Sequence, residues 1–133
     1  MSSWEVIHVP MHQAGRVVGL ADVIDLIEAP ALRWAIIEIE AIAEARSSVD
    51  VLELERRVRE SEGGVGFTHG SLLDLATNLT QVIECEIHGF LANPSEAVEA
   101  VVVVRALDST EWVLSLNETV IRLRPAHPLL RAL

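Results

Sequence analysis

The fold is decided by residues 81–116, which read QVIECEIHGFLANPSEAVEAVVVVRALDSTEWVLSL. Within residues 81–91 the side chains alternate between two sets, as in a strand with one buried face and one face in water. The inward set is Ile83, Cys85, Ile87, Gly89 and Leu91, and the outward set is Val82, Glu84, Glu86, His88 and Phe90. The alternation therefore predicts a strand that is half buried along its whole length.

Two more strands follow in the same stretch. Residues 99–107 include four consecutive valines, a β-branched run that suits a central strand covered on both faces. Residues 111–116 alternate again and carry Trp112. The connections around Asn93-Pro94-Ser95 and Asp108-Ser109-Thr110 have the composition of turns. Because they are too short for parallel crossovers, the three strands are predicted to form an antiparallel meander.

The segment from Leu32 to Glu44 has two interpretations. Its alternating, isoleucine-rich run Ile36-Ile37-Glu38-Ile39-Glu40 favours a strand. A helix is the alternative, because alanine, isoleucine and glutamate are all tolerated in helices. If the segment were a helix, the sheet would lose a strand and Glu38 and Glu40 would leave the sheet surface.

The other elements are read from periodicity and capping residues. Residues 4–9 predict a short strand that Pro10 confines to a sheet edge. Residues 65–68 are expected to be a short extended piece, and residues after Pro125 an irregular tail. Helices are predicted at residues 20–28, 50–62, 71–79 and, beginning at Asn117, to Leu123, where a strand is the alternative. The whole chain is thus expected to be one α+β domain, 1–133, with an antiparallel sheet of four to five strands and three to four helices mainly on one face.

Composition limits the kinds of function. The chain has a formal net charge of −10, and all ten basic residues are arginine. Its one basic cluster, Arg56-Arg57-Arg59, is interleaved with glutamates. Since nucleic acids are bound mainly through their phosphates, direct nucleic-acid binding is disfavoured.

Localisation is predicted from three features of the sequence. No apolar run approaches the roughly 20 residues that a membrane span requires. The N-terminus lacks the pattern of a signal peptide. A single cysteine, Cys85, excludes an internal disulfide framework and fits a reducing cytoplasm, and its inward position predicts a core residue rather than a nucleophile. The sequence thus predicts a cytoplasmic protein without a membrane partner.

The most notable constellation is a group of carboxylates on the predicted sheet. Alternate residues of a strand project to the same side, so Glu84, Glu86 and His88 share one face. If Glu38 and Glu40 lie on a neighbouring strand with the same polarity, four carboxylates and an imidazole come together. An ordinary solvated face, an acidic protein-binding patch, and a metal or acid–base site are the three interpretations.

Other motifs have ordinary explanations. His8 and His12 have helical spacing, but Pro10 lies between them, and neither HExxH nor a paired-cysteine motif is present. The Asp108-Ser109-Thr110 turn lacks the context of a hydrolase nucleophile. Gly63, Gly64 and Gly66 are not followed by lysine, so a turn is preferred to a phosphate-binding loop. No metal or cofactor is predicted.

Three tryptophans lie in predicted strands, namely Trp4, Trp34 and Trp112. Core packing is the ordinary role of such residues, and an exposed binding hot spot is the alternative. Trp112 is included with the carboxylates and His88 among the candidate protein-binding residues.

The sequence therefore predicts a non-catalytic protein that presents an acidic surface to a basic protein partner. A bacterial immunity or antitoxin-type inhibitor of a basic toxin is the concrete form of this hypothesis. A small enzyme or metal-binding domain built on Glu84, Glu86 and His88 is one alternative. A homodimeric structural subunit, joined through a sheet edge or a tryptophan patch, is another.

Overall fold

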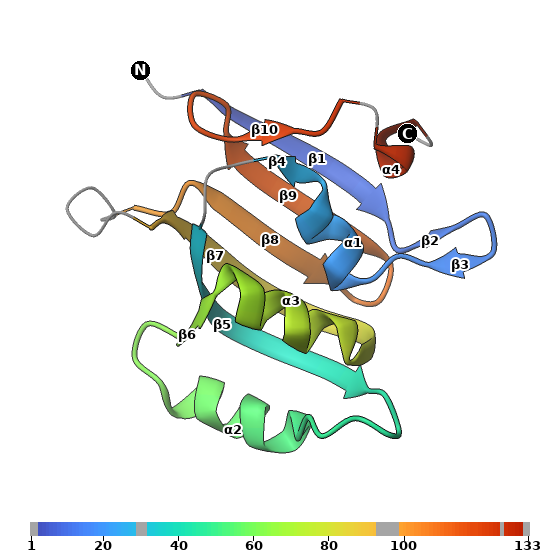
Figure 1. Cartoon of the computed structure of the whole chain (residues 1–133), viewed down its shortest axis with the longest axis vertical. Coiled ribbons are helices and arrows are strands. Elements are labelled where there is room, and N and C mark those ends of the chain that lie inside the picture. The colour runs from blue at the N-terminus through green and yellow to red at the C-terminus, as the bar shows by residue number, and fades with distance from the viewer. Residues whose placement is uncertain (1–2, 29–31, 93–98, 126, 132–133) are drawn as a thin grey trace.

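The computed structural model describes residues 3–28, 32–92, 99–125 and 127–131. They form a six-stranded antiparallel sheet with helices, as the predicted α+β class requires (Figure 1). In spatial order the strands are β1 (Trp4–Pro10), β9 (Glu111–Asn117), β8 (Val102–Leu107), β7 (Leu79–Leu91), β5 (Leu32–Ala43) and β6 (Val65–Thr68). The helices are α1 (Leu20–Asp25), α2 (Val51–Glu60), α3 (His69–Thr77) and α4 (Pro128–Arg131).

The central meander is present as predicted. β7 pairs with β8 and β8 with β9, all antiparallel. β5 is a strand rather than a helix, and it pairs with β7 along most of its length. β1 lies at the edge of the sheet against β9 and ends at Pro10. The sheet has one strand more than the four to five predicted, because the short extended piece at residues 65–68 pairs with β5 as β6.

Two predictions for the C-terminal part are wrong. The helix expected from Asn117 to Leu123 is a turn, in which Asn117 Oδ1 accepts a hydrogen bond from Thr119 N at 3.0 Å. The chain then pairs as β10 (Arg122–Leu123) with β4 (Ile27–Glu28), so the alternative prediction of a strand is correct for these two residues. This pairing also ends α1 earlier than predicted. Residues 128–131 form α4 instead of an irregular tail, with Pro128 at the helix start, where its missing N–H costs nothing.

One layer of helices covers one face of the sheet. α1 and α3 lie across it, and α2 runs alongside β5 at the sheet edge (Figure 1). A second small ladder, β2 (His12–Gln13) with β3 (Arg16–Val17), extends from β1. Asp50 caps α2 by accepting a hydrogen bond from Glu53 N at 3.0 Å, a role that aspartate commonly has at helix N-termini.

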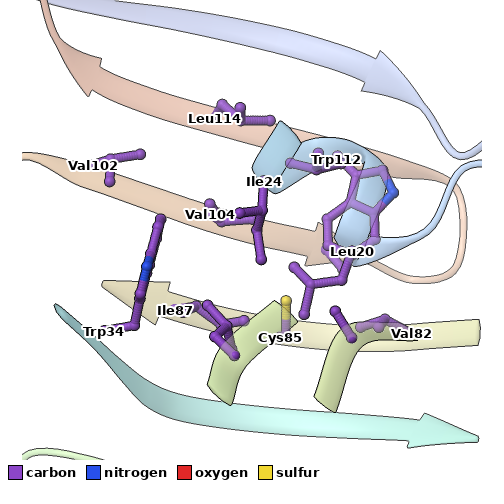
Figure 2. Close-up of a cluster of buried hydrophobic side chains, with 14 of the residues drawn as sticks. Leu20, Ile24, Trp34, Val82, Cys85, Ile87, Val102, Val104, Trp112 and Leu114 are labelled. Atoms are coloured by element: carbon purple, nitrogen blue, oxygen red, sulfur yellow. The ribbon is translucent and has the colours of Figure 1, made fainter. Parts of the chain in front are cut away.

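The core lies between the sheet and α1 and α3. Trp34, Cys85, Val104 and Trp112 all point toward this layer (Figure 2). Gly89 is required here, because a Cβ atom at this position would lie 2.5 Å from Val102 Cγ1 and 2.9 Å from Trp34 Cζ3. The glycine thus leaves room for the Trp34 ring.

A bulge at Ile83 corrects the predicted orientation near the start of β7. The register between β5 and β7 shifts three times, with an extra residue at Ile37 in β5 and at Ile83 and Thr80 in β7. Each extra residue reverses the alternation beyond it. Val82, predicted to face outward, is therefore buried, whereas Ile83 is only half buried.

Candidate functional site

The two faces of the sheet differ sharply in burial. On the face covered by α1 and α3, most side chains are buried. On the opposite face, no described side chain is buried. We call this second surface the open face. It consists of Trp4, Val6 and His8 of β1, Glu111, Val113, Ser115 and Asn117 of β9, Val103, Arg105 and Leu107 of β8, Glu84, Glu86, His88 and Phe90 of β7, and Arg33, Ala35, Glu38, Glu40 and Ile42 of β5.

Four glutamates form an acidic cluster on the open face. The register places Glu38 directly opposite Glu86, and Glu40 directly opposite Glu84. Directly opposed residues of antiparallel strands have Cβ atoms about 4.5–5.5 Å apart, and like charges at this spacing destabilise a sheet. Glu38 and Glu40 are exposed, and neither forms an ion pair with any other residue that the structure describes. Glu38 and Glu40 therefore present uncompensated negative charge to solvent.

The two inner carboxylates are held by hydrogen bonds. Glu86 Oε2 lies 2.8 Å from His88 Nε2, and Glu86 Oε1 lies 3.2 Å from Arg105 Nε. Glu84 Oε1 accepts a hydrogen bond from the backbone N–H of Asp108 at 2.9 Å. These contacts fix the position of β7 carboxylates while the β5 carboxylates stay open to a partner.

The same contacts bear on the metal or acid–base interpretation of this surface. Both oxygens of Glu86 already face cationic or imidazole groups of the chain itself. Within residues 3–28, 32–92, 99–125 and 127–131, no three His, Cys, Asp or Glu side chains are grouped so that they could hold a metal ion. The geometry thus supplies no observation in favour of metal chemistry at this face.

Repulsion within the acidic cluster should lower the free energy of unfolding. We expect Glu40→Gln to raise the free energy of unfolding by about 0.5 kcal/mol at low salt, because it removes one of two directly opposed charges. The gain should disappear at about 1 M salt, where the Debye length is about 3 Å. Urea denaturation of the variant and of Glu62→Gln, an exposed loop glutamate outside the open face, measures the difference. An equal gain in both variants would show a general effect of net charge instead.

The other end of the open face carries exposed apolar side chains. Trp4 and Val6 of β1 are 45% and 55% exposed, and the half-buried Val103 and Phe90 lie on the same face, two and three strands away from β1. The Arg33 guanidinium carbon lies 5.3 Å from the centre of the Phe90 ring, which orients both side chains. Trp4 and Val6 were not among the predicted site residues, because alternation alone does not show which face of an edge strand stays uncovered.

Trp112 does not belong to this surface. It is fully buried on the helix-covered face, and its Nε1 donates a hydrogen bond to the carbonyl oxygen of Val18 at 2.9 Å. Because no partner can reach it in the folded state, the proposed role of Trp112 in protein binding is wrong. Trp34 is also buried, and its Nε1 donates to His69 Nδ1 at 3.2 Å. Of the three tryptophans only Trp4 is exposed.

The histidines do not converge. His8 Nδ1 lies 3.3 Å from Glu111 Oε2, and His127 Nε2 lies 3.0 Å from Asp25 Oδ2. His69 accepts from Trp34, and His88 pairs with Glu86. Each of these four side chains has a different partner on a different part of the fold.

The two loop motifs have structural roles. Asp108 and Ser109 both have positive φ, as a tight hairpin turn requires, and Thr110 N donates to Leu107 O at 2.9 Å. At Gly64, with φ at +93°, a Cβ atom would lie 2.8 Å from Ile36 O. Gly64 is needed for the close approach of this turn to β5, and both motifs are explained without a ligand.

Cys85 is a core residue, as its inward position predicts. Its side chain is buried between the sheet and the helices (Figure 2). Burial raises the pKa of the Cys85 thiol to about 12. A hydrogen bond with the Ala106 backbone opposes this increase, and the charges of Glu38, Glu84 and Glu86 add to it. Because thiolate is the reactive form, the thiol is unreactive at neutral pH.

Two further findings complete the description of the chain. In the part that the structure describes, every helix is too short or too polar to cross a membrane. Comparison with protein-family models, with curated proteins and with solved structures found no significant match to this chain.

Proposed function

We propose that this protein is a non-catalytic binding domain that presents the acidic cluster on its open face to a basic protein partner. The observation that carries the proposal is the pairing of Glu38 with Glu86 and of Glu40 with Glu84 on an uncovered sheet face. Opposed like charges oppose folding, and natural proteins break such local rules most often at functional sites. A basic partner would relieve the repulsion by neutralising these carboxylates.

Several features support a protein as the partner. A net charge of −10 repels nucleic acids and attracts basic proteins, whose association it accelerates. An antiparallel sheet is a rigid platform, so its charges are pre-organised for contact. An immunity or antitoxin-type inhibitor of a basic toxin is the concrete form that we propose, acting in the cytoplasm, where a single buried thiol stays reduced.

Capture from a lysate of the organism that carries the gene tests this proposal. We expect the immobilised protein to retain a strongly basic protein at low salt and to release it at high salt, because exposed charge pairs are screened. For the partner so identified, Glu38→Lys with Glu40→Lys should lower the association rate at least about tenfold and flatten its salt dependence. Surface plasmon resonance at several salt concentrations measures both quantities.

Glu62→Lys with Asp74→Lys provides the matched control. Both residues are exposed, lie outside the open face and form no ion pair among the described residues, and the change in net charge is the same. The control should retain most of the association rate. If it loses as much as the open-face variant, or if no basic protein is retained, the proposed function is wrong.

A further inference from the structure

Exposed apolar side chains concentrate on the open face. Six large hydrophobic residues are markedly exposed among those described, and four of them lie on this face, namely Trp4, Val6, Ile42 and Leu107. The sheet and its helices leave these side chains without apolar neighbours above them. Exposed apolar residues gathered on one uncovered face mark an interaction surface more often than exposure scattered over the whole molecule does.

Trp4 and Val6 lie at one end of the strands, on β1, whereas Ile42 and Leu107 lie at the other end, next to the carboxylates. A row across the sheet contains Val6, Ser115, Val103, His88 and Ala35. The next row along the strands contains Glu86 and Glu38. The row after that contains Glu84 and Glu40. Same-face residues of a strand are about 7 Å apart and neighbouring strands about 4.8 Å apart, so Val6 on β1 lies about 16 Å from Glu86 on β7, within the footprint of one protein interface.

We propose that the partner presents an apolar patch beside its basic patch, and that Trp4, Val6 and Val103 are the anchor for the apolar part. This inference rests on the proposed function and adds a second chemical requirement to it. Charge complementarity selects a basic occupant, since a second copy of this chain would bring an identical acidic cluster. Aromatic and apolar anchors supply most of the binding energy in protein interfaces, while peripheral charges mainly set the association rate.

Two synthetic peptides serve as probes. Both contain the same number of arginines, with leucine between them in one and serine in the other. We expect the Arg/Leu peptide to bind at least about tenfold more tightly than the Arg/Ser peptide, which corresponds to burial of a few apolar groups. Calorimetry measures the affinities. Trp4 is the only exposed tryptophan and the chain has no tyrosine, so a blue shift of tryptophan emission reports burial of Trp4 itself.

Variants at the two exposed anchors locate the apolar contact. Trp4→Ser with Val6→Ser should lower the affinity for the Arg/Leu peptide to that for the Arg/Ser peptide and leave the latter unchanged. Leu52→Ser, at the exposed Leu52 of α2, is the matched control and should change neither affinity. Circular dichroism confirms that each variant is folded.

Each contrary outcome has a distinct meaning. Equal affinities of the two peptides for the wild-type protein, or no effect of the Trp4 and Val6 substitutions, would overturn the apolar anchor while the acidic binding function stands. If neither peptide binds, the proposed function itself fails. If sedimentation shows a dimer that Trp4→Ser with Val6→Ser dissociates, a second copy occupies the apolar end and the inference is overturned.

Discussion

Trp112→Ala is expected to lower the free energy of unfolding by about 3–5 kcal/mol, the usual cost of removing a buried tryptophan. Trp112 is completely buried between β9 and α1, so the substitution leaves a cavity that the surrounding core cannot fill (Figure 2). It also removes the donor for the Val18 carbonyl oxygen, which lies 2.9 Å from the indole nitrogen. Urea denaturation followed by circular dichroism measures the loss.

Trp4→Ala is the matched control, because the same residue type is 45% exposed there. We expect its cost to stay below about 1 kcal/mol, as for most substitutions at exposed sites. Equal losses at both positions would mean that Trp4 also packs in the core and would weaken its assignment to the open face. A small loss at Trp112 would contradict the described packing of β9 on the helices.

Alkaline pH is expected to destabilise this protein through Cys85. Burial raises the pKa of the folded thiol to about 12, while an unfolded thiol has a pKa near 8.5. Above about pH 8.5 the unfolded chain releases the proton that the folded chain retains, so the free energy of unfolding falls. The slope approaches about 1.4 kcal/mol per pH unit and continues toward pH 12, which amounts to about 3 kcal/mol by pH 11.

The composition allows the effect of Cys85 to be measured without other titrating side chains. The chain has no lysine and no tyrosine, so Cys85 is the only side chain that ordinarily titrates between about pH 8.5 and 12. Urea midpoints measured from pH 7 to the alkaline range should therefore fall in the wild type and remain nearly constant in Cys85→Ala. The variant loses some stability at pH 7, but its pH dependence decides the question. A parallel decline in both proteins would show that the thiol is accessible or that another group controls alkaline unfolding.

Much of the fold was predictable because its strands have local signatures. The alternation in residues 81–91, the valine run and the turn residues of the meander act between near neighbours, where sequence patterns are informative. The isoleucine-rich run around Ile37 correctly indicated β5 for the same reason. β6 was expected only as an extended piece, since four residues carry too little pattern to show that they pair with a distant strand.

The C-terminal errors came from long-range pairing. Asn117 has the chemistry of a helix cap, and it forms the corresponding local hydrogen bond to Thr119 N. Pairing of Arg122 and Leu123 with Glu28 and Ile27 then prevents a helix, and no pattern within residues 117–123 reports a partner nearly a hundred positions away. The bulge at Ile83, which turns Val82 inward, likewise depends on the register with β5.

By itself, the sequence determined the α+β class, the central meander and the strong negative charge, because periodicity and composition are properties of neighbouring residues. Only the tertiary structure decided that Glu38 faces Glu86 and Glu40 faces Glu84, that Trp112 is in the core, and that Trp4 and Val6 lie on the same open face as the carboxylates. These facts depend on which strand pairs with which and in what register. Register is set by burial over the entire sheet, where a shift of one residue would exchange the two faces.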